Sequence, residues 1–206
     1  GEDFASSHRG TLTIAATHSQ ARYALPPAVR DFSAAHPEVQ LRLHQGSPRQ
    51  VAEMLMAGEA DIGVATEALA QYEALVALPS YRWTHAVVVP RGHELALQAG
   101  QGTPLTLEQL ALHPIITYES GYTGRTHIDE AFERRGLALN IVLSAMDADV
   151  IKTYVELGMG VGIIASMAYD PVRDPTLGAI DASHLFATNV THLGLRRGSY
   201  LRDYVF

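Results

Sequence analysis

The stretch TLTIAATHSQARYALPPAVRDFSAAHPEVQLRLHQG, residues 11–46, decides the fold class. Residues 11–16 and 39–46 are strand-like runs, and the segment PPAVRDFSAAH between them has apolar residues at helical spacing. A second helical pattern, SPRQVAEMLMAG, leads into a third strand-like run at residues 60–66. The order strand, helix, strand, helix, strand predicts three parallel strands in one sheet, because crossovers between parallel strands are right-handed.

Helix termini within this unit carry their own signals. Ser47, followed by Pro48 and Gln50, predicts a helix start with the serine hydroxyl at the cap. Gly58 predicts the end of the same helix, because glycine adopts the left-handed backbone conformation that stops a helix.

A second alternating series follows a strand-rich segment, residues 74–95, that has no helical pattern. Helices are predicted at residues 106–113, 123–136 and 148–158, and strands at 114–119, 139–145, 160–166, 177–181 and 190–197, with a last helix from about Ser199. The run at 190–197 has no partner within the second unit. We therefore expect it to return to the first unit, so that two crossover strands link the units.

The predicted fold class is α/β, with two Rossmann-like subdomains around a ligand cleft at the carboxyl ends of the strands. Residues 11–84 plus 190–206 are assigned to subdomain I, and residues 85–189 to subdomain II. Residues 1–10 are interpreted as a linker remnant, because GEDFASSHRG lacks the apolar run of a signal peptide or membrane anchor. The ending SYLRDYVF has no capping glycine, so we expect the chain to be cut from a longer protein.

Composition narrows the function classes. Among 206 residues, 47% are apolar and 18% are charged, and the net charge is −7. This balance fits a soluble cytoplasmic protein without a membrane partner, and it argues against DNA binding through this chain. The chain has no cysteine, which excludes disulfides and thiolate chemistry.

The turn THSQ after the first strand contains Thr17, Ser19 and Gln20. In an α/β unit this turn meets a helix amino terminus, where backbone N–H groups lack partners and favour anions. Neutral hydroxyl and amide donors beside those groups would hold an oxyanion without a cation. The alternative is that Thr17 or Ser19 only caps the helix.

Two more predicted strand ends offer hydroxyl groups. Thr66 ends the third strand, and Thr123 stands at a predicted helix start between Gly121 and Gly124. The two glycines would allow close approach of the backbone to a ligand, or they serve only the turn. Arg125 and Lys152 are either cations facing the cleft or solvated helix residues.

The segments ATHSQARYALP, HQGSPRQVAE, ADIGVATEAL, YTGR, DADVIKTYVELGMGVGIIASMAYDP and LGLRRGSYLRDY together resemble the LysR-type transcriptional regulators, specifically the CysB subgroup. The resemblance spans roughly residues 9–206 and corresponds to the effector-binding portion. It implies a fold similar to type 2 periplasmic binding proteins, with the N-terminal winged helix-turn-helix missing from this chain.

The resemblance also implies a ligand site. Thr17, Ser19, Gln20, Thr66 and Thr123 match the anion site of the family, and Trp83 lies near the pocket in similar proteins. Ser19 replaces a more usual threonine but keeps the hydroxyl. Met146 replaces a smaller polar residue, which leaves the effector less defined.

The function implied is a cytoplasmic, homotetrameric activator of sulfur assimilation that is not an enzyme and carries no cofactor. This domain would form a dimer and bind sulfate, thiosulfate, N-acetylserine or O-acetylserine, and only the missing domain would bind promoter DNA. The alternatives are a sulfonate-utilisation regulator that senses adenosine phosphosulfate and an oxyanion solute-binding protein of a transporter.

Other chemistries have weak sequence support. The glycines of GMGVGII follow a helix and enter a strand, the reverse of a dinucleotide fingerprint. The histidines form no metal-binding motif, and neither a nucleophile elbow nor a Ser-His-Asp order is present, so no catalytic or metal residue is assigned. Asp147 and Asp149 are interpreted as helix caps rather than paired catalytic acids.

Overall fold

The computed structural model describes residues 10–199, which form two compact units. Unit 1 contains the described residues up to Tyr81 and from Val190 onward, and unit 2 runs from Arg82 to Asn189. Residues 82–84, which the sequence pattern assigned to the first unit, therefore group with the second. Among the described helices, none has the length and apolar character needed to cross a membrane.

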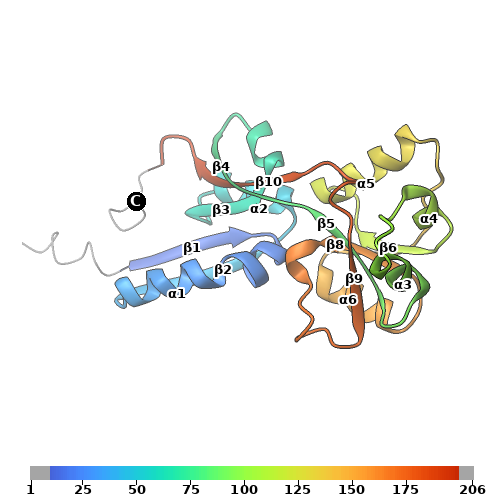
Figure 1. The fold of residues 1–206 in the computed structure, drawn as a ribbon. Coiled ribbons are helices and arrows are strands. Elements are labelled where there is room, and N and C mark those ends of the chain that lie inside the picture. The colour runs from blue at the N-terminus through green and yellow to red at the C-terminus, as the bar shows by residue number, and fades with distance from the viewer. Residues whose placement is uncertain (1–9, 200–206) are drawn as a thin grey trace, which may run out of the picture. The chain divides into compact units, whose positions relative to one another are not determined.

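The first sheet has the strand order β2-β1-β3-β10-β4 (Figure 1). The strands of this sheet and the helices that connect them are β1 (Gly10–Ala16), η1 (Gln20–Ala24), α1 (Pro26–Ala35), β2 (Val39–Gln45), α2 (Pro48–Met56), β3 (Ile62–Thr66), η2 (Glu67–Gln71), β4 (Leu75–Trp83) and β10 (Asn189–Arg196). Strands β2 and β3 each pair with β1 in parallel, as the sequence predicted. Strand β10 returns to pair antiparallel with β3, which confirms the predicted crossing of the chain.

The second sheet has the strand order β7-β6-β8-β5-β9. The strands of this sheet and the helices that connect them are β5 (His85–Pro90), α3 (Glu94–Gly100), α4 (Leu107–Ala111), β6 (Ile115–Tyr118), α5 (Thr123–Arg134), β7 (Ile141–Ala145), α6 (Ala148–Glu156), β8 (Val161–Ala165), η3 (Ser166–Ala168) and β9 (Leu177–Asp181). Strand β6 is parallel to β7 and β8, whereas β5 is antiparallel to β8 and β9. Both sheets are thus mixed, and the predicted α/β class with two subdomains is confirmed.

The segment between β1 and α1 contains a short helix in addition to the predicted one. Residues Gln20–Ala24 form a π-helix, and Pro26 and Pro27 occupy the first positions of α1 instead of interrupting it. Proline is tolerated there because the first N–H groups of a helix have no internal partner. The hydrogen bonds of a π-helix span one residue more than those of an α-helix, so the turn of η1 holds one more residue before α1 begins.

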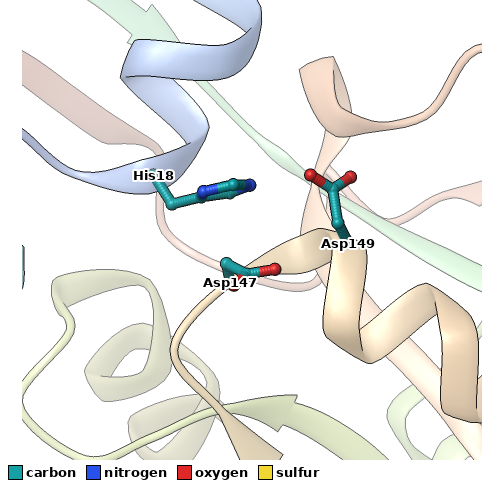
Figure 2. A group of neighbouring side chains, drawn as sticks. All are labelled: His18, Asp147 and Asp149. Carbon is teal, nitrogen blue, oxygen red and sulfur yellow. The ribbon is translucent and has the colours of Figure 1, made fainter. Parts of the chain in front are cut away.

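Polar caps fix where α2 and α6 begin. The Ser47 hydroxyl accepts a hydrogen bond from the Gln50 N–H, and the Gln50 side chain accepts one from the Ser47 N–H, a complete capping box. Asp147 Oδ1 accepts from the Val150 N–H at 2.9 Å. Figure 2 shows Asp147 at the start of α6 and Asp149 in its first turn; the third labelled residue, His18, belongs to unit 1. Asp147 is therefore a cap, as predicted.

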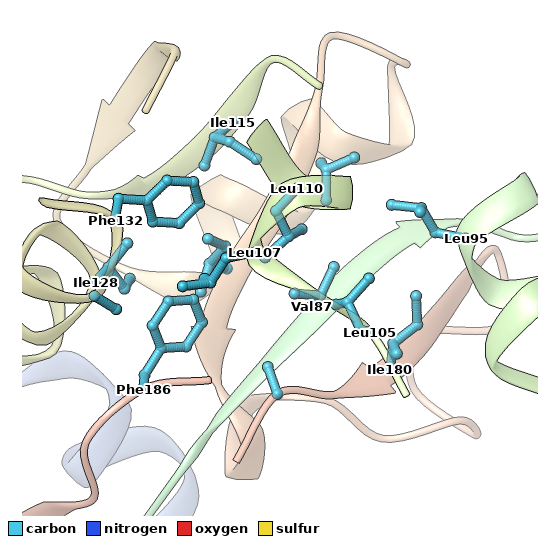
Figure 3. Packing of buried hydrophobic residues seen from close by; sticks show 14 of the residues in the cluster. Val87, Leu95, Leu105, Leu107, Leu110, Ile115, Ile128, Phe132, Ile180 and Phe186 are labelled. Carbon is cyan, nitrogen blue, oxygen red and sulfur yellow. The ribbon is translucent and has the colours of Figure 1, made fainter. Parts of the chain in front are cut away.

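The largest apolar cluster lies in unit 2 (Figure 3). Side chains from β5, β6, β8 and β9 pack against those of α3, α4 and α5, and Phe132 stacks on Phe186 with ring centroids 6.5 Å apart. Unit 1 has smaller clusters, the main one formed by α2 with β1 and β3.

One expectation about the remaining helices was wrong, and another lies almost entirely outside the described residues. Helix α3 begins at Glu94, inside the segment expected to be strand-rich, because His93 Nδ1 accepts from the Leu95 N–H and starts a short helix. The helix expected from about Ser199 lies outside the described residues except for Ser199 itself.

Candidate functional site

Four predicted site residues lie in unit 1 at the carboxyl ends of β1 and β3, and we call them the strand-end site: Thr17, Ser19, Gln20 and Thr66. Strands β1 and β3 are neighbours, and the Thr17 N–H donates to the Val64 carbonyl at 3.2 Å. The sheet therefore brings together residues that are about 50 positions apart in the sequence.

The helix-cap alternative fails for Ser19. Its backbone is helical and its hydroxyl makes no capping hydrogen bond to η1. The first turn of η1 thus begins without a side-chain cap. The Thr17 carbonyl accepts from the Ala21 N–H at 3.0 Å, so the backbone of Thr17 is committed to the turn.

Gln20 is buried, with 1% of its surface exposed, and its Oε1 atom has no hydrogen-bond partner among the described residues. A buried amide oxygen without a partner costs free energy and is uncommon in folded proteins. Since the two ends of a glutamine amide can exchange by rotation, the same group presents a donor or an acceptor to a ligand.

Thr66 is the last residue of β3, and it lies opposite Thr191 of β10 in the antiparallel register. Thr191 is fully buried and its Oγ1 atom has no hydrogen-bond partner among the described residues; the same holds for the hydroxyl of Tyr81. Burial raises the pKa of Tyr81, and the nearby Thr191 hydroxyl lowers it in part. The two hydroxyls are close neighbours, but they do not meet hydrogen-bond geometry.

Sequence reasoning missed Thr191 and Tyr81. A threonine inside a strand and a tyrosine in an extended segment carry no local signal. Only the return of β10 beside β3 shows that another hydroxyl stands next to Thr66.

The other two predicted residues, Thr123 and Trp83, belong to unit 2. Thr123 is the first residue of α5, as predicted from the sequence. Gly121 has a φ of +97° and so serves the turn, whereas Gly124 provides space: a Cβ there would lie 3.2 Å from His85 Nε2 and from Trp83 Cη2. Gly124 thus allows aromatic side chains of its own unit to approach α5.

His85 is 1% exposed, at the start of β5. The pKa of His85 is lowered to about 4, mainly through desolvation by burial and also through His127, while the nearby backbone of Gly124 partly opposes the shift. No atom pair between His85 and Gly124 meets hydrogen-bond geometry, and both ring nitrogens of His85 lack a partner among the described residues. Its imidazole is therefore neutral near pH 7.

Arg125 and Lys152, the two candidate cations, are engaged by partners within unit 2. Arg125 donates to Asp129 Oδ1 at 2.7 Å and to the Tyr118 carbonyl at 2.9 Å. Lys152 Nζ donates to the Ala168 carbonyl at 2.7 Å and to Asp174 Oδ1 at 3.0 Å. Neither is a solvated helix residue, because both are held by partners within unit 2.

Carboxylates lie at the strand ends of unit 2. Glu119 follows β6, and Asp147 and Asp149 open α6 after β7. The pKa of Tyr122 is raised by desolvation and by the charges of Glu119 and Asp147. Glu119 and Asp147 therefore disfavour a further negative charge at Tyr122, whereas Asp149 is paired with Lys152 Nζ at 3.3 Å.

Comparison with known proteins identifies the family. The family model described as "LysR substrate binding domain" matches residues 5–205. The HTH-type transcriptional regulator SsuR of Burkholderia cenocepacia is 53% identical over 203 residues, which are 98% of this chain and 65% of that protein. The CysB regulator of the same organism is 52% identical, covering all of this chain and 64% of that protein. The Escherichia coli regulator cbl is 49% identical over 98% of the chain and 63% of its own length.

Solved structures agree with this assignment. The cofactor-binding domain of the Cbl transcriptional regulator superposes with a TM-score of 0.89 at 50% identity, covering 96% of this chain and 85% of that one. The effector-binding domain of QuiR in complex with shikimate has a TM-score of 0.80 at 15% identity and shows the shared fold. The chain thus spans less than two thirds of the length of the curated relatives. It belongs to the LysR substrate-binding-domain family, and its close homologues are regulators of the CysB, Cbl and SsuR type.

Proposed function

We propose that the chain is the effector-binding domain of a cytoplasmic LysR-type activator of sulfur assimilation, and that its effector is held at the strand-end site. The effector is a small oxyanion or an oxyanion derivative: sulfate, thiosulfate, N-acetylserine, O-acetylserine or adenosine phosphosulfate. The chain acts as a sensor and not as an enzyme.

The observation that carries this proposal is a set of neutral polar groups at one sheet edge. Ser19 caps nothing, Gln20 Oε1 is buried without a partner among the described residues, and Thr17 stands beside both. Neutral hydroxyl and amide donors suit an oxyanion, because each hydrogen bond to a charged acceptor contributes about 1.5–3 kcal/mol. Thr123 and Trp83 of unit 2 remain candidate contacts.

In the whole protein, the domain would dimerise within a tetramer, and promoter DNA would be bound by a segment outside this chain. Effector binding would shift the population of conformations, which requires different effector affinities in the two states. The names of the relatives favour a regulator over a solute-binding protein of a transporter.

Calorimetric titration of the 206-residue chain with each candidate effector tests the proposal. We expect saturable binding that Thr17→Ala weakens about 10-fold or more, because one hydrogen bond to a charged group is lost. Arg49→Ala is the matched control, since Arg49 pairs only with Glu53 on the exposed face of α2. Equal binding by the Thr17 variant and the unsubstituted chain would refute the site.

Footprints of the intact regulator on its promoter test the proposed response. A change in the footprint on adding the tightest effector supports the population shift, and identical footprints contradict it. Comparing sulfate with adenosine phosphosulfate separates a cysteine regulator from a sulfonate regulator.

A further inference from the structure

An open cavity of about 650 Å³ lies within unit 2, apart from every predicted site residue. Its walls are the start of α4, the last turn of α5 and residues 184–187, which follow β9. Helix α5 runs from Thr123 to Arg134, and at 1.5 Å per residue its two ends are about 16 Å apart. The cavity therefore lies at the far end of α5 from Thr123, and its volume falls within the range of about 300–1,000 Å³ that is typical of small-molecule sites.

The floor of this cavity is apolar and preformed. Leu105, Leu107 and Phe186 line it, and their exposed fractions are only 4%, 8% and 5%. Figure 3 shows these three side chains within the packed cluster of unit 2, so the floor is the outer side of that cluster. Close packing fixes such side chains in place. An apolar ligand that covers the floor gains free energy without first rearranging the core.

Most polar groups at the rim of the cavity are already engaged. His184 Nε2 donates to the Leu105 carbonyl at 2.7 Å, because a carbonyl oxygen can only accept. Arg135 is paired with Glu108, which joins the end of α5 to the first turn of α4. These contacts hold the walls together, and the Arg135–Glu108 pair adds no net charge to the cavity.

Arg134 is the exception at this rim. Its Nε atom donates only a long hydrogen bond, 3.4 Å, to the Glu130 carbonyl, and its guanidinium has no carboxylate partner among the described residues. The residue is exposed and lines the cavity. A guanidinium presents parallel N–H groups that match the two oxygens of a carboxylate. The cavity thus combines an apolar floor with one cation that can accept a carboxylate.

We propose that this cavity binds a small monocarboxylic acid with an apolar body, the carboxylate at Arg134 and the body on the floor. An uncharged apolar ligand would leave the Arg134 guanidinium unused, and a small inorganic anion would leave the floor uncovered. A second negative charge would meet the carboxylate of Glu108, which favours a monoanion. The inference goes beyond the proposed function, because every residue of the cavity belongs to unit 2.

Calorimetric titration of the 206-residue chain with octanoate tests the inference. Acetate lacks the apolar body and 1-octanol lacks the charge, so we expect octanoate to bind about fivefold tighter than either, or more. Arg134→Met should weaken octanoate about fivefold, the size of an exposed ion pair, and Arg134→Lys should restore most of the affinity. Arg49→Met is the matched control, because it removes an exposed arginine from unit 1 and should change nothing.

Nuclear magnetic resonance gives the position of the bound octanoate. Shifts of backbone amides centred on residues 104–108, 131–135 and 184–187 support the inference, and shifts centred elsewhere refute it. Absence of octanoate binding, or equal binding by Arg134→Met and the unsubstituted chain, also refutes it. Binding of 1-octanol or acetate as tightly as octanoate does the same, because the charge or the apolar body then has no role. Failure of the strand-end site is a separate result, seen in the sulfate titration of Thr17→Ala.

Discussion

The strand ends of the two units differ in how their polar groups are used. In unit 1, Gln20 and Thr191 are buried without partners among the described residues, and Ser19 does not cap the helix that it precedes. In unit 2, Arg125 and Lys152 are bound by carboxylates and carbonyls. Both units therefore have buried polar atoms without partners among the described residues, since His85 of unit 2 is one of them, but the two cations of unit 2 are already paired.

This difference indicates which of the two edges is better suited to bind an anion. Buried neutral side chains without partners gain from binding an oxyanion, because their hydrogen bonds are otherwise unmade. Carboxylates at the unit 2 edge repel an anion, and its buried ion pair stabilises the fold only while both partners remain. Four experiments can break or sharpen this comparison.

The largest effect is expected for Lys152→Met. Lys152 and Asp174 are 9% and 11% exposed, and losing the ammonium leaves Asp174 buried without its ion pair. We expect unit 2 to lose about 3–5 kcal/mol of unfolding free energy. Trp83, the only tryptophan, belongs to unit 2, so its fluorescence during denaturation by urea follows this unit.

Arg49→Met is the control for Lys152→Met, because the Arg49–Glu53 pair is exposed and contributes little. A loss as small as that of the control would mean that the buried pair does not hold unit 2 together.

Acid should destabilise unit 2 through His85. The pKa of folded His85 is about 4, against 6.5 for the unperturbed group, so the unfolded chain takes up the proton first as the pH falls. Stability is full above about pH 6.5 and is lost toward pH 4, by about 3 kcal/mol in total. Trp83 fluorescence in urea at several pH values measures the loss.

His85→Gln removes the titrating group and should flatten the pH dependence between pH 6.5 and 4. An unchanged slope in this variant would assign the acid sensitivity to other groups.

Thr17→Ala and Thr123→Ala compare the two strand ends directly. We expect Thr17→Ala to cost about 1.5–3 kcal/mol of anion binding, and Thr123→Ala to cost less, because the charges of Glu119 and Asp147 act on the neighbouring Tyr122. Calorimetry with sulfate measures both. An equal or larger loss for Thr123→Ala would contradict the assignment of the anion to unit 1.

The smallest effect is expected for two substitutions of Asp147, which separate its capping hydrogen bond at α6 from its charge. Asp147→Asn keeps a good capping residue and should change the stability of unit 2 by only a few tenths of a kcal/mol, whereas Asp147→Ala should cost about 1 kcal/mol. Thermal denaturation followed by Trp83 fluorescence compares the two. Equal losses would mean that the charge of Asp147, and not its hydrogen bond to Val150, stabilises α6.

Most of the fold was predictable from local patterns. The alternation of strands and helices gave the boundaries of β1, β2, β6 and α5 to within one or two residues, and the return of β10 followed from its lack of a partner. The prediction missed α3 and the π-turn of η1, because short helices have weak periodicity and their start depends on a single cap or turn.

The candidate site was predictable in part. Thr17, Ser19, Gln20 and Thr66 follow or end strands, so topology alone places them at one edge. The roles of Arg125 and Lys152 could not be predicted, because their partners, Tyr118, Asp129 and Asp174, are chosen by packing.

The sequence by itself determined the α/β class, the parallel core of unit 1, the caps at Ser47 and Asp147, and the family resemblance. These features depend on periodicity and short-range hydrogen bonds, which neighbouring residues encode. Only the tertiary structure decided that polar atoms of Gln20, Thr191 and Tyr81 are buried without partners among the described residues, and that His85 is neutral. Burial and pairing across strands depend on contacts between distant residues, and local sequence does not specify them.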